Sequence, residues 1–164
     1  MSRPFRIPSA GAAWLLAVAG LAAAGFGAAG PAAAEGGAKA ETVLAFVASA
    51  LAHIEAVGEE RAFADFSTVP GPWVKGEYYI FCHSLEGVNV AHGGNPGLVG
   101  KKVLGFRDPA GLLVNVLILD KVKAEGKGWV QYEWPNPVTG KVAPKFIYSE
   151  KVHDKFVCGS GYYE

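Results

Sequence analysis

Apolar residues recur every three or four positions over residues 41–57, which is the spacing of one stripe on an amphipathic helix. The stripe consists of Val43, Phe46, Val47, Ala50, Leu51, Ile54 and Val57. Gly58 follows directly, in the position where glycine commonly ends a helix. Residues 59–66 predict a second short helix, which the Val-Pro-Gly-Pro run at 69–72 brings to an end.

Short apolar runs separated by turn residues predict strands in the second half of the chain. A strand over 77–84, a turn at 85–87 and a strand over 88–92 predict a hairpin. Three more strands are expected over 129–134, 145–152 and 155–163. With the two helices before them, these strands predict an α+β domain with a five-stranded antiparallel sheet.

Residues 93–125 separate the hairpin from the last three strands and form an excursion outside the sheet. Glycine and proline are frequent over 93–111, and helical spacing returns over 112–125 before Gly126. The strand sequences YYIF and KFIY show no polar alternation, which is typical of strands that are covered on both faces. We expect the long first helix to cover one face and the excursion to cover the other. A ligand would then sit between the excursion and the sheet.

Residues 1–34 have the features of a signal peptide. Two arginines begin the segment, a run rich in Ala, Leu and Gly follows, and Ala32-Ala33-Ala34 supplies the small residues that signal peptidase needs. The alternative is an uncleaved membrane anchor, because the apolar run approaches the roughly 20 residues of a spanning helix. With cleavage, a flexible lead-in over 35–40 precedes a single domain at 41–164, and the protein is periplasmic or secreted.

The charge of the mature chain excludes some classes of partner. Removal of Arg3 and Arg6 from the 15 basic side chains leaves 13, against 15 acidic ones. A scattered net charge near −2 offers no electrostatic footprint for nucleic acid or for anionic lipid. Beyond the signal segment, the longest apolar run, 112–119, is too short to span a bilayer. We therefore expect no nucleic-acid partner and no stable membrane insertion after cleavage.

Six motifs, in order along the chain, resemble those of the single Cache domains, a family of PAS-like extracytoplasmic sensor modules of bacteria. They are the aromatic run YYIF before a glycine turn, AHGGNPGLVGK, a DPAG turn, GWVQYEWPNPVTG, a PK pair before an apolar strand, and the closing CGSGYY. The resemblance covers about residues 41–163. It implies a PAS-like fold and ligands such as short carboxylic acids, from acetate to lactate or pyruvate in size.

The two cysteines, Cys82 and Cys158, are expected to lie opposite each other. The resemblance implies this placement, because the first and last strands of a PAS-like sheet are neighbours. Export would bring the cysteines into a compartment where disulfides persist. Two buried free thiols are the alternative, since cysteine is among the residues most often found inside. A bridge requires Cα atoms within about 4.4–6.8 Å of each other.

Lys145 and His92 are the charged and polar candidates for the ligand site. Lys145 follows Pro144 and precedes Phe-Ile-Tyr, so at least its stem should be partly buried, and a buried ammonium needs an anion or several hydrogen bonds. A lysine whose tip reaches water at the strand edge is the alternative. His92 precedes two glycines, and its imidazole either donates to a carboxylate or caps the turn.

Tyr132, Trp134 and Tyr79 complete the predicted ligand-binding set. Tyr132 and Trp134 are two residues apart on one strand, so they face the same side. Core packing is the ordinary role of such rings, yet buried hydroxyl and indole N–H groups need partners, and a carboxylate oxygen is a good one. In the predicted site, Lys145 neutralises the carboxylate while His92 and Tyr132 donate hydrogen bonds to it.

No residue pattern indicates catalysis. Ser160 lies between two glycines but lacks the strand–turn–helix context of a nucleophile elbow, and the adjacent Cys82 and His83 point to opposite faces of a strand. The four histidines lack metal-binding spacing, and no cofactor is expected. The predicted function is an extracytoplasmic ligand-binding or sensory module for a small organic anion. A non-catalytic interaction or structural protein with a filled pocket is the alternative.

The sequence shows no transmembrane segment after the predicted domain. We therefore expect this module to act in signal transduction through a membrane receptor, a kinase or a transporter. A second copy of the chain, in a homodimer, is a further candidate partner.

Overall fold

The computed structural model describes residues 31–164, with side chains from residue 37 onward. The predicted signal peptide therefore lies outside the described residues, except for its last four positions. The helical segments are α1 (Pro31–Val57), α2 (Glu59–Phe66), the short 3-10 helix η1 (Pro96–Leu98) and α3 (Val114–Glu125). The strands are β1 (Val74–Lys75), β2 (Tyr78–Tyr79), β3 (Phe81–Ser84), β4 (Asn89–His92), β5 (Lys127–Pro135), β6 (Val142–Val152) and β7 (Phe156–Tyr163).

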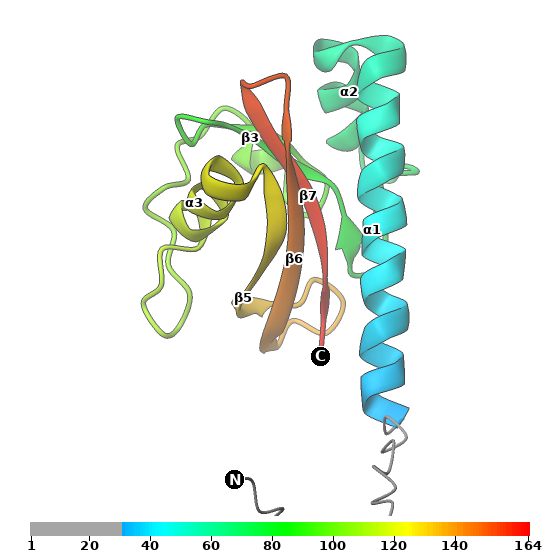
Figure 1. Cartoon of the computed structure of the whole chain (residues 1–164), viewed down its shortest axis with the longest axis vertical. Coiled ribbons are helices and arrows are strands. Elements are labelled where there is room, and N and C mark those ends of the chain that lie inside the picture. The colour runs from blue at the N-terminus through cyan, green and yellow to red at the C-terminus, as the bar shows by residue number, and fades with distance from the viewer. Residues whose placement is uncertain (1–30) are drawn as a thin grey trace, which may run out of the picture.

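Five strands form an antiparallel sheet in the order β4-β3-β7-β6-β5, which confirms the predicted α+β class. α1 runs along one side of this sheet and α3 lies on the other (Figure 1). On the α1 side, Ile54 belongs to the same buried cluster as Cys158. On the α3 side, Ile118 belongs to the same cluster as Ile147. The expectation that both faces of the sheet are covered is thus confirmed.

α1 begins at Pro31, so the segment 35–40, expected as a flexible lead-in, is helical. Alanine is frequent here and is the strongest helix former, and proline is favoured in the first turn. Lys39 also ties the segment to the domain, since its Nζ donates to the Tyr163 carbonyl oxygen at 2.7 Å and lies 3.7 Å from Glu77 Oε1. The apolar pattern did not predict a helix over residues 31–40 because this segment has no large apolar residues.

The Gly37–Val57 part of α1 is long and apolar enough to cross a membrane, with a mean hydropathy of 1.5. Its large apolar side chains are nevertheless used inside the domain. The buried positions of this stripe are Val43, Phe46, Val47, Ala50 and Ile54. Because they fill the core between α1 and the sheet, we assign this part of α1 to the domain core.

The predicted strand over 77–84 is interrupted at Ile80, so it forms two strands instead of one. β2 pairs with β1 in a separate two-stranded sheet, in which Val74 faces Tyr79. The turn between them contains Gly76 at φ 63°, a conformation that glycine adopts without steric cost. Only β3 continues into the main sheet, and Tyr79 stands beside the sheet instead of within it.

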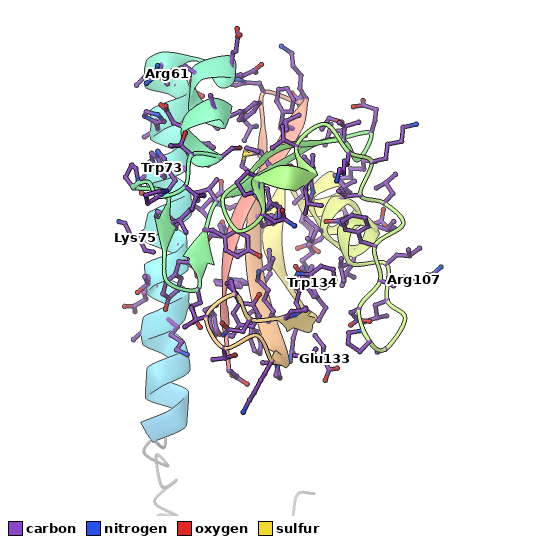
Figure 2. The ribbon with its side chains drawn as sticks, turned by 180° about the vertical axis from the view of Figure 1, so that it is seen from behind. Arg61, Trp73, Lys75, Arg107, Glu133 and Trp134 are labelled. Atoms are coloured by element: carbon purple, nitrogen blue, oxygen red, sulfur yellow. A yellow bond between two sulfur atoms is a disulfide. The ribbon has the colours of Figure 1, made fainter. Side chains whose placement is uncertain are left out.

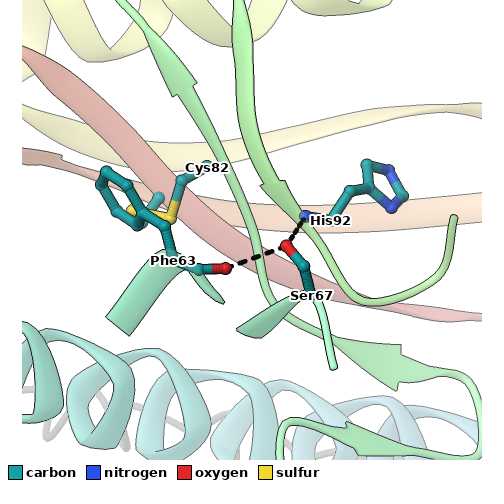
Figure 3. The surroundings of a disulfide bond; sticks show 5 residues. Phe63, Ser67, Cys82 and His92 are labelled. Atoms are coloured by element: carbon teal, nitrogen blue, oxygen red, sulfur yellow. Dashed lines mark hydrogen bonds between the residues drawn. A yellow bond between two sulfur atoms is a disulfide. The ribbon is translucent and has the colours of Figure 1, made fainter. Parts of the chain in front are cut away.

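Cys82 and Cys158 form the predicted disulfide (Figure 3). They are direct partners across β3 and β7, so the expectation that the first and last strands are neighbours is confirmed. Their Cα atoms are 4.1 Å apart, slightly below the predicted range. The alternative of two free thiols is wrong.

A buried carboxylate, Asp108, fixes the excursion to the sheet. Its Oδ1 accepts a hydrogen bond from the Leu112 N–H at 2.8 Å, and its Oδ2 accepts one from the Glu133 N–H at 3.3 Å. The first bond closes the Asp-Pro-Ala-Gly turn, and the second reaches β5. The loop before α3 is thereby held against the strand that carries Tyr132.

A second carboxylate, Glu77, connects three parts of the chain that are distant in sequence. Its Oε1 accepts from the Tyr163 N–H at 3.3 Å and lies 3.7 Å from Lys39 Nζ, and its Oε2 accepts from Asn136 Nδ2 at 3.3 Å. Glu77 therefore links α1, the end of β7 and the loop between β5 and β6.

Replacement of this carboxylate by Glu77→Ala should lower the free energy of unfolding by about 1–3 kcal/mol, because a charged acceptor with several donors is removed. Glu133→Ala is the matched control: Glu133 is exposed (Figure 2), and such substitutions change stability by about 0.5 kcal/mol or less. Urea unfolding of the two variants measures the difference. Equal losses in both would show that the Glu77 contacts contribute nothing.

Candidate ligand-binding site

Lys145 is the most deeply buried charged side chain of the described residues, with 1% of its surface exposed. On the sheet it lies opposite Tyr132 on β5 and Tyr163 on β7. Its Nζ donates a hydrogen bond to the Tyr79 hydroxyl. The same atom lies 4.2 Å from the centre of the Tyr79 ring and 4.8 Å from that of Tyr163. The alternative in which the lysine tip reaches water is therefore wrong.

This ammonium has no anionic partner, since none of the ion pairs among the described residues includes Lys145. One hydroxyl and two aromatic rings surround it. Cation–π contacts compensate buried charge only partly, by about 0.5–2 kcal/mol each. Because a buried cation is costly without an anion, Lys145 is an unmatched positive charge inside the domain.

Both the backbone and the ring of His92 make hydrogen bonds that fix its position. Its backbone N–H donates to Ser67 Oγ at 3.2 Å, and Ser67 Oγ donates to the Phe63 carbonyl at 2.9 Å, while the imidazole points away from Ser67 (Figure 3). The ring nitrogen Nδ1 accepts from the Asn95 N–H at 2.9 Å. A neutral ring that accepts at Nδ1 carries its proton on Nε2. His92 therefore caps the turn and still has a donor to offer.

The environment keeps the His92 ring neutral at neutral pH. Burial, and next to it the positive charge of Lys145, lower the pKa of His92 to about 4. The ring lies 5.0 Å from that of Tyr79, between centres. His92 can thus donate a hydrogen bond to an anion without itself carrying a charge.

Tyr132 and Trp134 lie on the same face of β5, as predicted. Tyr132 is buried in the cluster of the α3 side, and Trp134 packs against that cluster. Their rings are 5.9 Å apart and perpendicular. Burial, followed by the neighbouring Tyr79, raises the pKa of Tyr132 well above its usual value. Its hydroxyl therefore keeps a proton that it can donate. Figure 2 shows Trp134 on the side of the sheet where the excursion, with Arg107, lies.

The structure brings four of the five predicted site residues to one cavity between the sheet and the excursion. Its volume is about 30 Å³. The lining residues are Tyr79, Phe81, His83, Asn89, His92, Leu98, Val103, Phe106, Val114, Asn115, Ile118, Tyr132, Trp134 and Ile147. The fifth residue, Lys145, does not line the cavity and contacts the Tyr79 hydroxyl instead. Sequence reasoning did not assign His83, Asn89 or Asn115 to the site, although each is a polar residue inside an apolar element.

A wider hollow of about 430 Å³ adjoins this cavity. Both are bordered by Tyr79, His92, Leu98, Phe106 and Trp134. The volume of the inner cavity is close to that of one water molecule. A larger ligand that enters from the hollow therefore has to displace some of these five shared side chains. The hollow leads from the β5–β6 loop toward the buried site.

The acid sensitivity of folding should report the buried state of His83. Burial, and next to it His92, lower the pKa of His83 to about 3. The folded state then binds fewer protons than the unfolded state between the usual pKa and this value, so stability is lost as pH falls through that window. His83→Leu should abolish about 2 kcal/mol of the loss between about pH 7 and about pH 5, measured by urea unfolding. Equal acid sensitivity in both proteins would contradict the neutral, buried ring.

A larger open hollow lies at the junction of α1 and α2, with a volume of about 840 Å³. Its lining includes Glu55, Glu59 and His153. The two carboxylates hydrogen-bond the His153 ring at 2.7 and 2.8 Å, and Glu59 first and Glu55 second raise the pKa of His153. Arg61 and Lys155 also line this hollow, but Arg61 is paired with Asp65 and Lys155 lies 4.0 Å from Glu59. Among the described residues, Lys145 lacks such a carboxylate partner, so the cavity beside it suits an organic anion better.

The family profile of Single Cache domain 2 matches residues 50–163 of this sequence. The match confirms the resemblance seen in the six motifs. No curated protein matches the sequence.

Three solved structures share the fold. A methyl-accepting chemotaxis protein from Vibrio parahaemolyticus has a TM-score of 0.67 and 21% identity, over 77% of this chain and 89% of that chain. The periplasmic sensor domain of a chemotaxis protein has a TM-score of 0.64 and 27% identity, over 82% and 99%. A Cache chemosensory domain described for carboxylic acid recognition has a TM-score of 0.62 and 24% identity, over 79% and 93%.

Proposed function

Since this chain belongs to the single Cache domain 2 family, we propose that it is an extracytoplasmic sensor module whose cavity binds a small organic anion, a short carboxylic acid. The observation that carries the proposal is the buried ammonium of Lys145, which has no anionic partner among the described residues. The carboxylic acid recognition described for one structural neighbour supports the same class of ligand.

The surrounding groups suit a carboxylate in charge and in hydrogen bonding. Lys145 donates to the Tyr79 hydroxyl, which strengthens that hydroxyl as a donor. His92 Nε2–H and the Tyr132 hydroxyl supply two further neutral donors at the cavity wall. The carboxylate would accept from these donors, with the charge of Lys145 next to it. The rings of Phe81 and Trp134 and other apolar side chains would bound a short apolar tail.

Matched acids and amides test this proposal directly. Acetate and propionate should raise the melting temperature as their concentration increases, because a ligand that binds the folded state stabilises it by mass action. Acetamide and propionamide have nearly the same shape but no charge, so they should give no shift. If the amides shift the melting temperature as much as the acids, Lys145 does not select the ligand.

A specific observation favours the alternative, an interaction or structural protein with a filled pocket. The inner cavity of about 30 Å³ holds no more than about one water molecule. Binding of an acid therefore requires Leu98, Phe106 or Trp134 to move. The acid–amide comparison separates the two functions, since a filled pocket responds to neither class.

The proposed location is the periplasm or the exterior, with cleavage of residues 1–34. Cleavage before Glu35 would remove the first four residues of α1. Mass spectrometry of the exported protein tests this, and retention of residues 1–34 would support the anchor instead. The proposed partner is a membrane receptor, kinase or transporter, and a second copy of the chain is the alternative. Two of the structural neighbours are parts of chemotaxis proteins.

A further inference from the structure

Two polar side chains at the β3–β4 end of the cavity have no use in carboxylate binding. Asn89 is fully buried, and neither its Nδ2 nor its Oδ1 has a hydrogen-bond partner among residues 31–164. His83 is 3% exposed, and its Nδ1 is also without a partner in this range. The two residues are paired across β3 and β4, and both line the cavity.

A β-bulge turns Asn89 toward the cavity. Cys82 is paired with Ala91, but the next residue, His83, is paired with Asn89, so Val90 is the extra residue of β4. Regular alternation would place Asn89 on the same face as Ala91, which packs in the cluster on the α1 side. The bulge instead places Asn89 on the α3 face of the sheet, together with His92. Bulges commonly redirect a side chain in this way beside functional sites.

The unpaired groups of Asn89 are unusual in a folded domain. Buried polar groups are nearly always hydrogen-bonded, and each unsatisfied one is destabilising. Asn115, on the opposite wall of the cavity, follows the rule, because its Nδ2 donates to the Val103 carbonyl at 2.8 Å. An asparagine that lines this cavity can therefore find a hydrogen-bond partner within the domain, whereas Asn89 does not.

The chemistry of this end of the cavity is neutral. Burial, and next to it His92, lower the pKa of His83 to about 3, so its ring is uncharged. None of the residues that line the cavity is Lys, Arg, Asp or Glu. Asn89 offers both a donor and an acceptor. A group that matches them has to donate and accept hydrogen bonds without carrying charge.

We propose that Asn89 and His83 form a second subsite, which takes a neutral hydroxyl or carboxamide group at the far end of the carboxylate ligand. This inference rests on the proposed function, since the carboxylate end of the ligand is held beside Lys145. Asn89 and His92 are three residues apart on β4, so the two subsites are separated by about 10 Å at most along the strand. The ligand is thus a short acid with a polar far end.

Four-carbon acids that differ only at the far end test the subsite. Butyrate, 4-hydroxybutyrate, succinamate and succinate should be titrated by calorimetry into the full chain and into Asn89→Leu. The wild type should bind 4-hydroxybutyrate and succinamate about tenfold more tightly than butyrate, as expected for satisfying a buried polar group. Asn89→Leu should bind butyrate at least as well and should lose this preference. Succinate should gain nothing over butyrate in either protein.

Other outcomes overturn the subsite. Equal affinities of the wild type for butyrate and 4-hydroxybutyrate would show that Asn89 does not contact the ligand and binds a structural water instead. An unchanged preference of Asn89→Leu for 4-hydroxybutyrate over butyrate would show the same. Tightest binding of succinate would show that the subsite takes charge. If Asn89→Leu does not fold, His83→Leu serves in its place, with the same expected loss of preference. Failure of the proposed function looks different, because then none of the four acids binds the wild type.

Discussion

Lys145→Met is expected to weaken the binding of short carboxylates by about 100-fold or more. Removal of one partner of a buried charge pair costs about 3–5 kcal/mol, and every 1.4 kcal/mol is about tenfold in affinity. Methionine has a similar length, so the cavity beside Tyr79 keeps its shape. Calorimetric titration of acetate or propionate into both proteins measures the change.

The same substitution should raise the stability of the ligand-free protein, because it removes a buried charge without an anionic partner. Lys141→Met is the matched control, since Lys141 is exposed in the loop that precedes β6. That control should change neither the affinity nor the melting temperature appreciably. Unchanged affinity in Lys145→Met would mean that the ammonium only packs against Tyr79 and Tyr163.

Loss of the disulfide is expected to lower the melting temperature by about 10 °C or more. The bridge closes a loop between residues separated by 76 positions, for which the chain-entropy account gives about 4 kcal/mol. For a domain of this size, 1 kcal/mol corresponds to several degrees, about 3–6 °C. The double variant Cys82→Ala/Cys158→Ala, melted beside the wild type with and without reductant, measures the effect.

The double variant also provides the control for the reductant. Reductant should lower the melting temperature of the wild type to near that of the variant and should leave the variant unchanged. A wild type that melts within about 2 °C of the double variant would contradict a stabilising bridge between β3 and β7.

Sequence reasoning predicted the parts of the fold that depend on periodicity and order. The stripe from Val43 to Ile54 identified the buried side of α1. The resemblance implied that the first and last strands are neighbours, and the pairing of Cys82 with Cys158 bears this out. The apolar neighbours of Lys145 indicated that its stem is at least partly buried, and the structure buries the tip as well.

The positions of Tyr79 and Asn89 were not predicted, because both depend on local departures from regular strands. The interruption at Ile80 sends Tyr79 out of the sheet and toward Lys145, whereas the YYIF run resembles one continuous strand. The extra residue Val90 reverses the facing of Asn89, and strict alternation places that residue on the wrong side. Both departures lie in short hairpins, β1–β2 and β3–β4, and a run of apolar residues does not specify where such a hairpin breaks or bulges.

A crystal structure of the protein grown with propionate is the most direct test of the central claim, that Lys145 marks the binding site of a carboxylate. The expected electron density lies in the cavity between the sheet and α3, with carboxylate oxygens within about 3 Å of His92 Nε2 and of Tyr132 or Tyr79. Leu98, Phe106 or Trp134 should be displaced to make room. Propionate bound only elsewhere, with the cavity beside Tyr79 and Lys145 unchanged, would contradict the account.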